Sequence, residues 1–279
     1  MADSVANLLQ ALAPSVAYKE SNLQQNKKVW NMYAKDWDQD TEWVKKMTAN
    51  LGDEWSSEPL RYVGDEWSDR ESLTQVIDEF IAPYIPSGGV VAELGVGGGR
   101  VAVKIVKKCK ELHCLDISSE MLKRAKKAIS DVISEEETSV FFHELSANEL
   151  PSTLDQRIDF IYSFDCLPHC DQHTIFSYLK EFIRALKPGC HALVHTSCIT
   201  SADGFARFAK QKEASVQGFC WTSPDTVRFL ARQAGAVCGN VRERSLSCRL
   251  RAGARHGPLG ALSQPLLPPR LPRPAPHRC

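Results

Sequence analysis

The sequence predicts an α/β fold, with a doubly wound, mostly parallel sheet that carries helices on both faces. From residue 88 onward, short apolar runs alternate with amphipathic stretches of helical period. This alternation is typical of a parallel sheet covered on both sides. Capping residues also precede the helical stretches, such as Asp171 before one and Ser223-Pro224 before another.

The elements follow one another in a regular order. We expect strands at residues 90–94, 111–117, 139–145, 157–164, 190–197 and 236–246, and helices at residues 100–109, 118–133, 171–186 and 223–235. The turn Lys187-Pro188-Gly189 is expected to stop the third of these helices. Gly235 is placed to end the fourth.

Residues 1–87 form a separate region that is rich in tryptophan. Five of the six tryptophans lie between residues 30 and 67, namely Trp30, Trp37, Trp43, Trp55 and Trp67. We interpret the region as a helical extension whose indoles pin it to the sheet domain. A second interpretation makes it a lid over a ligand, with Tyr33, Trp37 and Trp67 as wall residues. An arm that packs on the sheet can serve both purposes.

The C-terminal residues 251–279 differ from the rest in composition. They contain five arginines, seven prolines and no acidic residue. Such a segment is expected to be disordered or polyproline-like. Residues 1–250 then hold 29 basic and 34 acidic residues, a net charge of about −5. An acidic body makes nucleic acid an unlikely partner.

Composition also limits the location and the metal chemistry. No stretch of 18 apolar residues exists, so no membrane span is predicted. The chain starts without the basic segment of a secretory signal, and its ten cysteines include no CxxC pair. We therefore expect reduced thiols in a cytoplasmic protein. The spacing Cys166-x3-Cys170 lacks a second Cys/His pair, so no metal site is predicted.

The stretch AELGVGGGR, residues 92–100, is the first candidate ligand loop. Glycines after a parallel strand let the backbone approach a ligand closely. A dinucleotide fingerprint GxGxxG would need a glycine where Arg100 stands. Glu93 would repel a pyrophosphate, whereas it would attract the ammonium and sulfonium of S-adenosylmethionine. The loop therefore favours S-adenosylmethionine over a nicotinamide dinucleotide.

Asp116 gives an independent indication. It ends the next predicted strand, 23 residues after Glu93. A carboxylate at that point can accept hydrogen bonds from both ribose hydroxyls. The alternative is that Asp116 only caps the helix that follows.

Residues 88 to about 250 resemble a class I S-adenosylmethionine-dependent methyltransferase, closest to those that act on small molecules. The resemblance is carried by VVAELGVGGGR, LHCLDISSEML, NELP, IDFIYSFDCLPHC and the LKPG turn before CHALVHTS, in that order. It implies a seven-stranded sheet and S-adenosylmethionine as the cofactor.

The resemblance also implies individual roles. Glu93, Gly95 and Gly97 would hold the methionine portion, and Asp116 the ribose. Ile117 would pack on the adenine, and Phe164 would lie beside the cofactor. Ser146 and Ala147 would contact the adenine edge, although many family members have an aspartate where Ser146 stands here.

A further departure concerns the last strand. The resemblance implies a seventh strand, inserted beside the fifth. After residues 236–246, no alternating run remains except the stub SLSCRL, residues 245–250. The sequence therefore leaves two alternatives: this stub forms the last strand, or the strand is missing, with low stability or dependence on a partner as the result.

Catalytic candidates follow the fourth strand. His169 is the best general base, because imidazole titrates near neutrality, and Asp165 lies nearby. Each could instead order the loop. His143 and His195 lie within strands and are expected to be structural, while Arg207, Phe208 and Trp221 could line an acceptor pocket. The DCLPH stretch lacks the paired proline typical of nucleobase methylation, which again disfavours nucleic acid.

Two functions are compatible with these patterns. The first is an enzyme that methylates an oxygen or nitrogen of a small molecule. The alternative is a non-catalytic isoform with an altered C-terminus, which acts through partners if at all. Ser146 and the lost strand favour the alternative, whereas Glu93, the glycine loop and Asp116 favour the enzyme.

Overall fold

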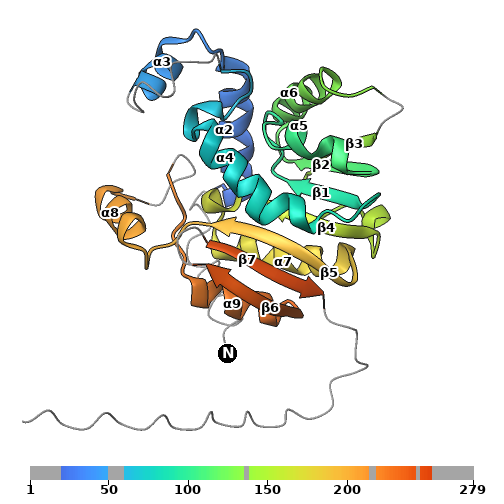
Figure 1. Ribbon diagram of the computed structural model, residues 1–279. Helices are drawn as coiled ribbons and strands as arrows, with labels where there is room; N and C mark the ends of the chain where they lie inside the picture. The colour runs from blue at the N-terminus through green and yellow to red at the C-terminus, as the bar shows by residue number, and fades with distance from the viewer. Residues whose placement is uncertain (1–19, 50–59, 135–137, 214–217, 243–245, 253–279) are drawn as a thin grey trace, which may run out of the picture.

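The computed structural model describes residues 20–49, 60–134, 138–213, 218–242 and 246–252 (Figure 1). Trp55 and most of the predicted tail lie outside the described residues. In the part that is described, no helix is both long and apolar enough to cross a membrane.

A single seven-stranded sheet forms the centre, in the order β3-β2-β1-β4-β5-β7-β6. Its strands are β1 (Val90–Leu94), β2 (Glu111–Asp116), β3 (Ser139–Glu144), β4 (Ile158–Ser163), β5 (Leu186–Thr196), β6 (Ala236–Arg242) and β7 (Leu246–Ala252). The first five are parallel, and β7 runs antiparallel to both neighbours. The predicted fold class is confirmed.

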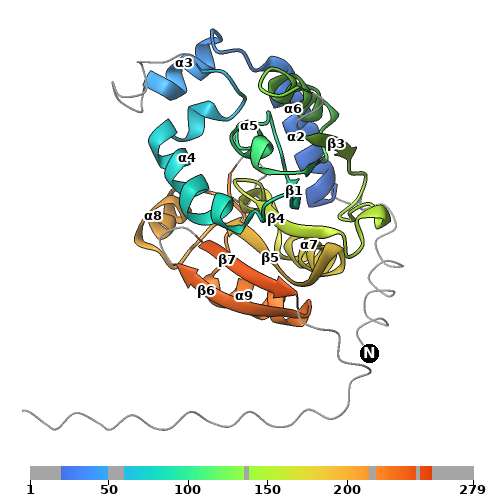
Figure 2. The same ribbon diagram turned by 45° about the vertical axis from the view of Figure 1, so that its right-hand side comes forward.

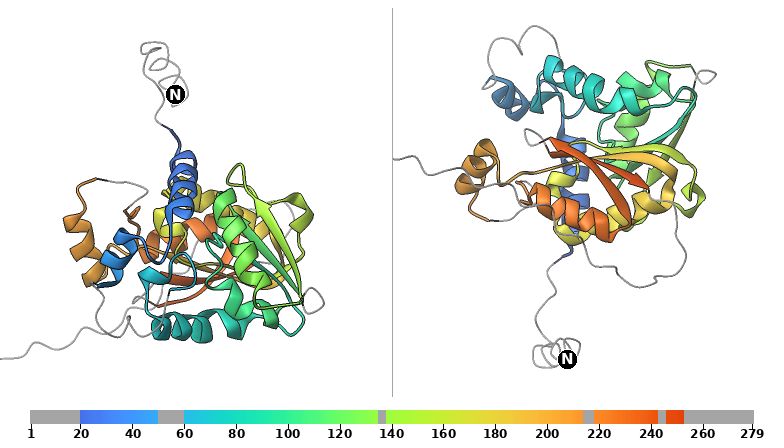
Figure 3. Two further views of the ribbon diagram at one scale, coloured as in Figure 1. Left: turned by 90° about the horizontal axis from the view of Figure 1, so that it is seen from above. Right: turned by 60° about the horizontal axis from the view of Figure 1, so that its bottom comes forward.

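Helices cover both faces of this sheet, as the turned view in Figure 3 shows. One hydrophobic cluster joins the sheet to α7 (Gln172–Ala185) and α9 (Pro224–Gln233). The other joins it to α4 (Arg70–Val76), α5 (Ala102–Ile105) and α6 (Ser119–Ser130). Successive strand residues point to opposite faces, so the central strands read as continuous apolar runs.

The predicted helix caps are confirmed. Asp171 accepts a hydrogen bond from the Thr174 amide at 2.8 Å, and Ser223 accepts one from the Thr226 amide at 3.2 Å. Gly235 follows α9 with φ +95°, a conformation that glycine adopts without strain.

The Lys187-Pro188-Gly189 turn has a different place from the one predicted. Helix α7 already ends at Ala185, and Leu186 is extended and pairs with Ile158 of β4. The next residue pair joins Phe160 to His191, so the three turn residues form an irregularity inside β5. They kink a strand instead of stopping a helix.

Of the two alternatives for the last strand, the stub forms it, and the strand is not missing. Strand β7 pairs with β5 from His191↔Arg251 to Thr196↔Leu246, and with β6 on its other side. It includes residues 246–250 of the predicted stub and extends two residues past them, to Ala252. Main-chain pairing on both sides stabilises a strand even where the side-chain pattern is weak. The argument for low stability therefore loses its premise.

The N-terminal region is helical where it is described. Helices α2 (Asn22–Asp36) and α3 (Glu42–Ala49) precede the short η2 (Asp65–Trp67), and a π-helical turn, η3 (Ile77–Ile81), continues α4. Helix α2 packs against α6, and in Figure 2 it passes beside α5 and α6 at one end of the sheet. A small core of Ala34, Trp37, Val44, Val63 and Met121 joins this arm to the sheet domain.

Candidate functional site

The glycine loop follows β1 at the carboxyl edge of the sheet. The amides of Gly95 and Val96 donate to the Leu115 carbonyl at the end of β2, at 2.7 and 3.2 Å. Gly95 has φ +75°, and a Cβ there would lie 2.4 Å from the Cys166 side chain. Gly97 has φ +53°, and a Cβ there would meet open space. The loop thus passes tightly beside β4 and then opens towards a cavity.

The helix after the loop is shorter than predicted. Residues 100–109 were expected to be helical, but α5 covers only Ala102–Ile105 and continues as the 3-10 turn η5 (Val106–Lys108). Arg100 lies before it and turns its side chain towards the arm, where its guanidinium donates to the Gly64 carbonyl at 2.8 Å.

Two buried carboxylates face the glycine loop. Glu93 is 2% exposed and accepts a hydrogen bond of 2.6 Å from the Tyr162 hydroxyl. Burial raises the pKa of Glu93 to about 8, although Tyr162 and Arg100 partly oppose the shift. A buried carboxyl that is so costly to ionise gains most from a nearby cation.

Asp116 is the second of these carboxylates and is 7% exposed. It accepts hydrogen bonds from the Gly97 amide at 3.0 Å and from the Ser118 amide at 2.8 Å. Burial raises its pKa to about 6. Ser118, and not Asp116, is the residue that caps α6, because its hydroxyl accepts from the Met121 amide.

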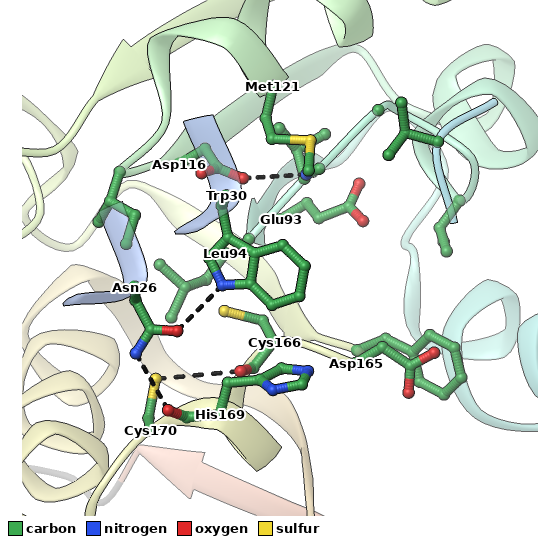
Figure 4. A pocket seen from close by; sticks show the side chains of 18 of the residues that line it. Asn26, Trp30, Glu93, Leu94, Asp116, Met121, Asp165, Cys166, His169 and Cys170 are labelled. Carbon is green, nitrogen blue, oxygen red and sulfur yellow. Dashed lines mark hydrogen bonds between the residues drawn. The ribbon is translucent and has the colours of Figure 1, made fainter. Parts of the chain in front are cut away.

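These groups line a first cavity of about 90 Å³ (Figure 4). Of the predicted cofactor residues, the cavity brings together Glu93, Gly95, Gly97, Asp116, Ile117 and Phe164, and it also includes Asp165 and His169. Ser146 and Ala147 are not among its lining residues. They follow β3, which is two strands away from β1 at the edge of the sheet.

Helix α2 lies across this cavity. The Trp30 indole lines the cavity and appears between Asp116 and His169 in Figure 4. Its Nε1 donates to Asn26 at 3.0 Å, and the Asn26 amide donates to the His169 carbonyl at 3.0 Å. At the other side, Asn31 accepts from the Ser118 hydroxyl at 2.7 Å. The arm therefore bridges the β4 loop and the start of α6.

Asp165 lies just beyond β4 in a strained conformation, with φ +55°. Its carboxylate pairs with Arg100 and lies 3.0 Å from Nδ1 of His195. Burial alone would raise the pKa of Asp165, but the hydrogen bond from His195 and the charges of His195 and Arg100 hold it below its ordinary value. Asp165 is therefore an anion between two cationic or hydrogen-bonding partners.

Of the three histidines that the sequence singled out, His195 has a different place from the one predicted. The Nδ1 atom of His169 lies 2.9 Å from the Gly218 carbonyl oxygen. The His169 ring meets the Trp30 ring edge-on, with the ring centroids 4.9 Å apart. His195, expected to be structural, lies beside Asp165 and stacks on Phe164 at 4.9 Å. Its place at the carboxyl end of β5 was a signal that could have identified it. His143 pairs with His113 at 3.1 Å and lines neither cavity.

A second cavity of about 1010 Å³ opens beside the first. The two share Trp30, Trp67, Asp165 and His169. Of the predicted wall residues, Tyr33, Trp67, Arg207 and Trp221 line this second cavity, as does His195. Phe208 lines neither cavity, and it meets the Trp221 ring edge-on at 6.0 Å.

Trp37 does not line either cavity, because it is buried behind the wall. Its Nε1 donates to Glu66 at 3.0 Å. Trp30 and the thiols of Cys166 and Cys170 were not predicted to line the first cavity. The position of Trp30 depends on how the arm docks, which no local pattern reveals.

Comparison with known proteins finds a family model that matches part of the chain. Residues 91–189 match the family model described as "methyltransferase domain". No curated protein matches the sequence significantly.

Solved structures with the same fold are numerous. A Methanosarcina mazei S-adenosylmethionine-dependent methyltransferase is 16% identical, with 62% of this chain and 95% of that chain covered and a TM-score of 0.51. A Burkholderia thailandensis O-methyltransferase family protein is 16% identical, with 67% of this chain and 57% of that chain covered and a TM-score of 0.54. A Pyrococcus horikoshii protein is 17% identical, with 68% of this chain and 96% of that chain covered and a TM-score of 0.54.

Proposed function

We propose that the chain is a class I S-adenosylmethionine-dependent methyltransferase, because residues 91–189 match the methyltransferase-domain model, and that it methylates a nitrogen or oxygen atom of a small molecule. We propose that the cofactor binds in the first cavity and the acceptor in the second. The observation that carries the proposal is the buried carboxyl of Glu93 at the glycine loop, whose pKa burial raises to about 8.

The residues of the first cavity fit this cofactor. Glu93 would hold the ammonium of its methionine portion, since an adjacent cation stabilises the buried carboxylate. Asp116 would accept from the ribose hydroxyls while it keeps the Gly97 amide in place. Ile117 and Phe164 supply apolar contacts, and Gly97 leaves open space for the ligand. For Ser146 and Ala147, the adenine-edge role remains a prediction.

The arm must move to admit such a ligand. The first cavity measures about 90 Å³, whereas pockets for ligands of this class span about 300–1,000 Å³. We propose that residues 1–87 act as a lid on the domain of residues 88–250, with residues 251–279 as a tail. Trp30 would be the residue that swings out of the first cavity.

Methyl transfer depends more on aligning the acceptor with the methyl group than on activating that group. S-adenosylmethionine supplies, when bound, an electrophilic methyl group on a positively charged sulfur. The chain would hold the acceptor in line with that group and exclude water, which the aromatic arm is placed to do. For an acceptor that must lose a proton, His169 is the proposed base. Asp165 lies at the junction of the two cavities and orients His195.

The non-catalytic alternative is now less favoured. One of its two supports, the missing strand, is gone, and only the substitution at Ser146 remains. For the location we propose the cytoplasm, because Cys109, Cys114, Cys166, Cys170, Cys198 and Cys220 are free thiols.

The pH dependence of ligand binding tests the role of Glu93. In the free protein the carboxyl is protonated below about pH 8, but it must be ionised to hold an ammonium. The affinity for S-adenosylhomocysteine is therefore expected to rise between pH 6.5 and 8, by up to about tenfold per unit, and then to level off. Calorimetry in buffers of different ionisation enthalpy should also detect a released proton at pH 7.

Two variants complete this test. Glu93→Gln keeps an acceptor for the Tyr162 hydroxyl but cannot ionise, so its affinity should be lower and its pH profile flat. Asp131→Asn, on the exposed end of α6, serves as the matched control. The stability of the free protein gives a further test. Folding raises the pKa of Glu93, so the contribution of this carboxyl to the free energy of unfolding is lost as the pH rises from 4.5 towards 8. A pH profile of Glu93→Gln equal to that of the wild type would remove Glu93 from the site.

A further inference from the structure

The second cavity has a wall of aromatic rings. On the arm, Tyr33 contacts Trp43 and Trp67 with ring centroids 5.0 and 5.4 Å apart, and Trp30 contacts Trp67 at 5.7 Å. From the segment after β5, Phe219 and Trp221 also line this cavity and meet edge-on at 5.5 Å. A ligand that enters the cavity therefore meets aromatic rings from two separate segments of the chain.

A buried carboxylate holds the arm wall in position. Glu66 is 0% exposed and accepts from the Tyr33 hydroxyl, from Trp37 Nε1 at 3.0 Å and from the Gly64 amide at 3.0 Å. Burial, followed by the charge of Glu66, raises the pKa of Tyr33 well above its ordinary value, so this ring stays a neutral phenol. The wall is thus preorganised and carries negative charge behind its rings.

The charges around the second cavity are mostly negative. Its described lining residues include four carboxylates, those of Asp36, Glu66, Asp165 and Asp203, and one permanent cation, Arg207. Arg100, which lines the first cavity, pairs with Asp165 and neutralises its negative charge. Asp36, at the end of α2, and Asp203, in the first turn of α8 (Ala202–Lys210), are exposed at the rim. Such a lining attracts cations and opposes phosphates and carboxylates.

We propose that the second cavity takes an amine acceptor, carried on a bulky aromatic or apolar skeleton. The inference rests on the proposed function and names its substrate class. Aromatic rings and carboxylates both stabilise an ammonium group. The bound ammonium must first lose a proton, for which His169 is the proposed base. In the transfer itself, the nitrogen lone pair that this exposes forms the new bond to the methyl carbon, and the carbon–sulfur bond breaks with its electron pair left on sulfur. The positive charge then passes to nitrogen, beside Trp30, Trp67 and Asp165, until a proton leaves to water.

Three probes with one skeleton test this inference. Tryptamine, tryptophol and indole-3-acetate share the indole ring but present a cation, a neutral hydroxyl and an anion. Each is titrated by calorimetry into the full chain at pH 7, with and without saturating S-adenosylhomocysteine. Tryptamine is expected to bind roughly tenfold more tightly than tryptophol, and indole-3-acetate more weakly than both.

A rim variant separates charge from shape. The double substitution Asp36→Asn with Asp203→Asn is expected to reduce the preference for tryptamine over tryptophol to about threefold or less. Asp131→Asn, which is exposed and remote from both cavities, should keep the full preference. Thermal unfolding by circular dichroism verifies that each variant is folded.

The outcomes are separable from those of the proposed function. Equal affinities for tryptamine and tryptophol, or a preference for indole-3-acetate, would overturn the amine inference even if S-adenosylhomocysteine binds. If S-adenosylhomocysteine fails to bind, the proposed function fails. In that case the titrations without S-adenosylhomocysteine decide the amine inference. A preference for tryptamine in the wild type that is lost in the rim variant would still support an amine site in the second cavity.

Discussion

Deleting residues 243–279 is expected to abolish cooperative unfolding. The deletion removes β7, which connects β5 to β6 through six residue pairs on one side and five on the other. Strand β6 pairs only with β7 among the described strands. At about 1 kcal/mol per hydrogen bond, this loss is comparable with the roughly 5–15 kcal/mol that stabilises a whole domain.

The matched control ends the chain at Ala252. It keeps every described strand, so it is expected to unfold in urea at the same midpoint as the full chain. Circular dichroism follows both transitions. A cooperative transition near the wild-type midpoint in the chain that ends at Arg242 would contradict the place given to β7.

Replacing Arg100 by methionine is expected to have the second largest effect on stability. Arg100 is 6% exposed and joins three parts of the molecule. It pairs with Asp165 after β4, and it donates to the Gly64 carbonyl and the Ser68 hydroxyl of the arm at 2.8 and 2.9 Å. Breaking a fully buried pair costs about 3–5 kcal/mol. Asp165 is 28% exposed and keeps His195 as a partner, so the loss expected here is about 1–3 kcal/mol. Urea unfolding measures this loss directly.

A second variant isolates the buried charge. Adding Asp165→Asn to Arg100→Met removes the carboxylate that has lost its guanidinium partner, so the double variant should be more stable than Arg100→Met alone. Lys45→Met, which removes an exposed pair with Asp40, should change the free energy of unfolding by less than about 1 kcal/mol. A loss below that value for Arg100→Met would mean that the arm is held in another way.

The sheet domain could be predicted from sequence because its signals are local. The buried parallel strands β1, β2 and β4 are apolar runs, and the caps Asp171 and Ser223 act within three residues. Strand β7 carried no such pattern, since its partners β5 and β6 decide whether it forms. The Lys187-Pro188-Gly189 turn was misinterpreted because the same residues can stop a helix or kink a strand.

The site was predictable where it follows directly from the strands. Glu93, Gly97 and Asp116 lie at carboxyl ends of adjacent strands, as their spacing indicated. Ser146 was placed by resemblance alone, and the strand order puts its loop two strands from the glycine loop. Trp30 could not be identified from its neighbours in sequence, and the one signal for His195 was its place at the carboxyl end of a predicted strand. The pairing of His195 with Asp165 and the docking of Trp30 depend on contacts between distant segments.

Calorimetric titration of the full-length chain with S-adenosylhomocysteine, with NADH as the control, tests the central claim most directly. Both ligands contain a ribose that Asp116 could bind, so the comparison depends on Glu93 and the glycine loop. We expect micromolar binding of S-adenosylhomocysteine and no binding of NADH. A folded sample that binds NADH, or neither ligand, would contradict it.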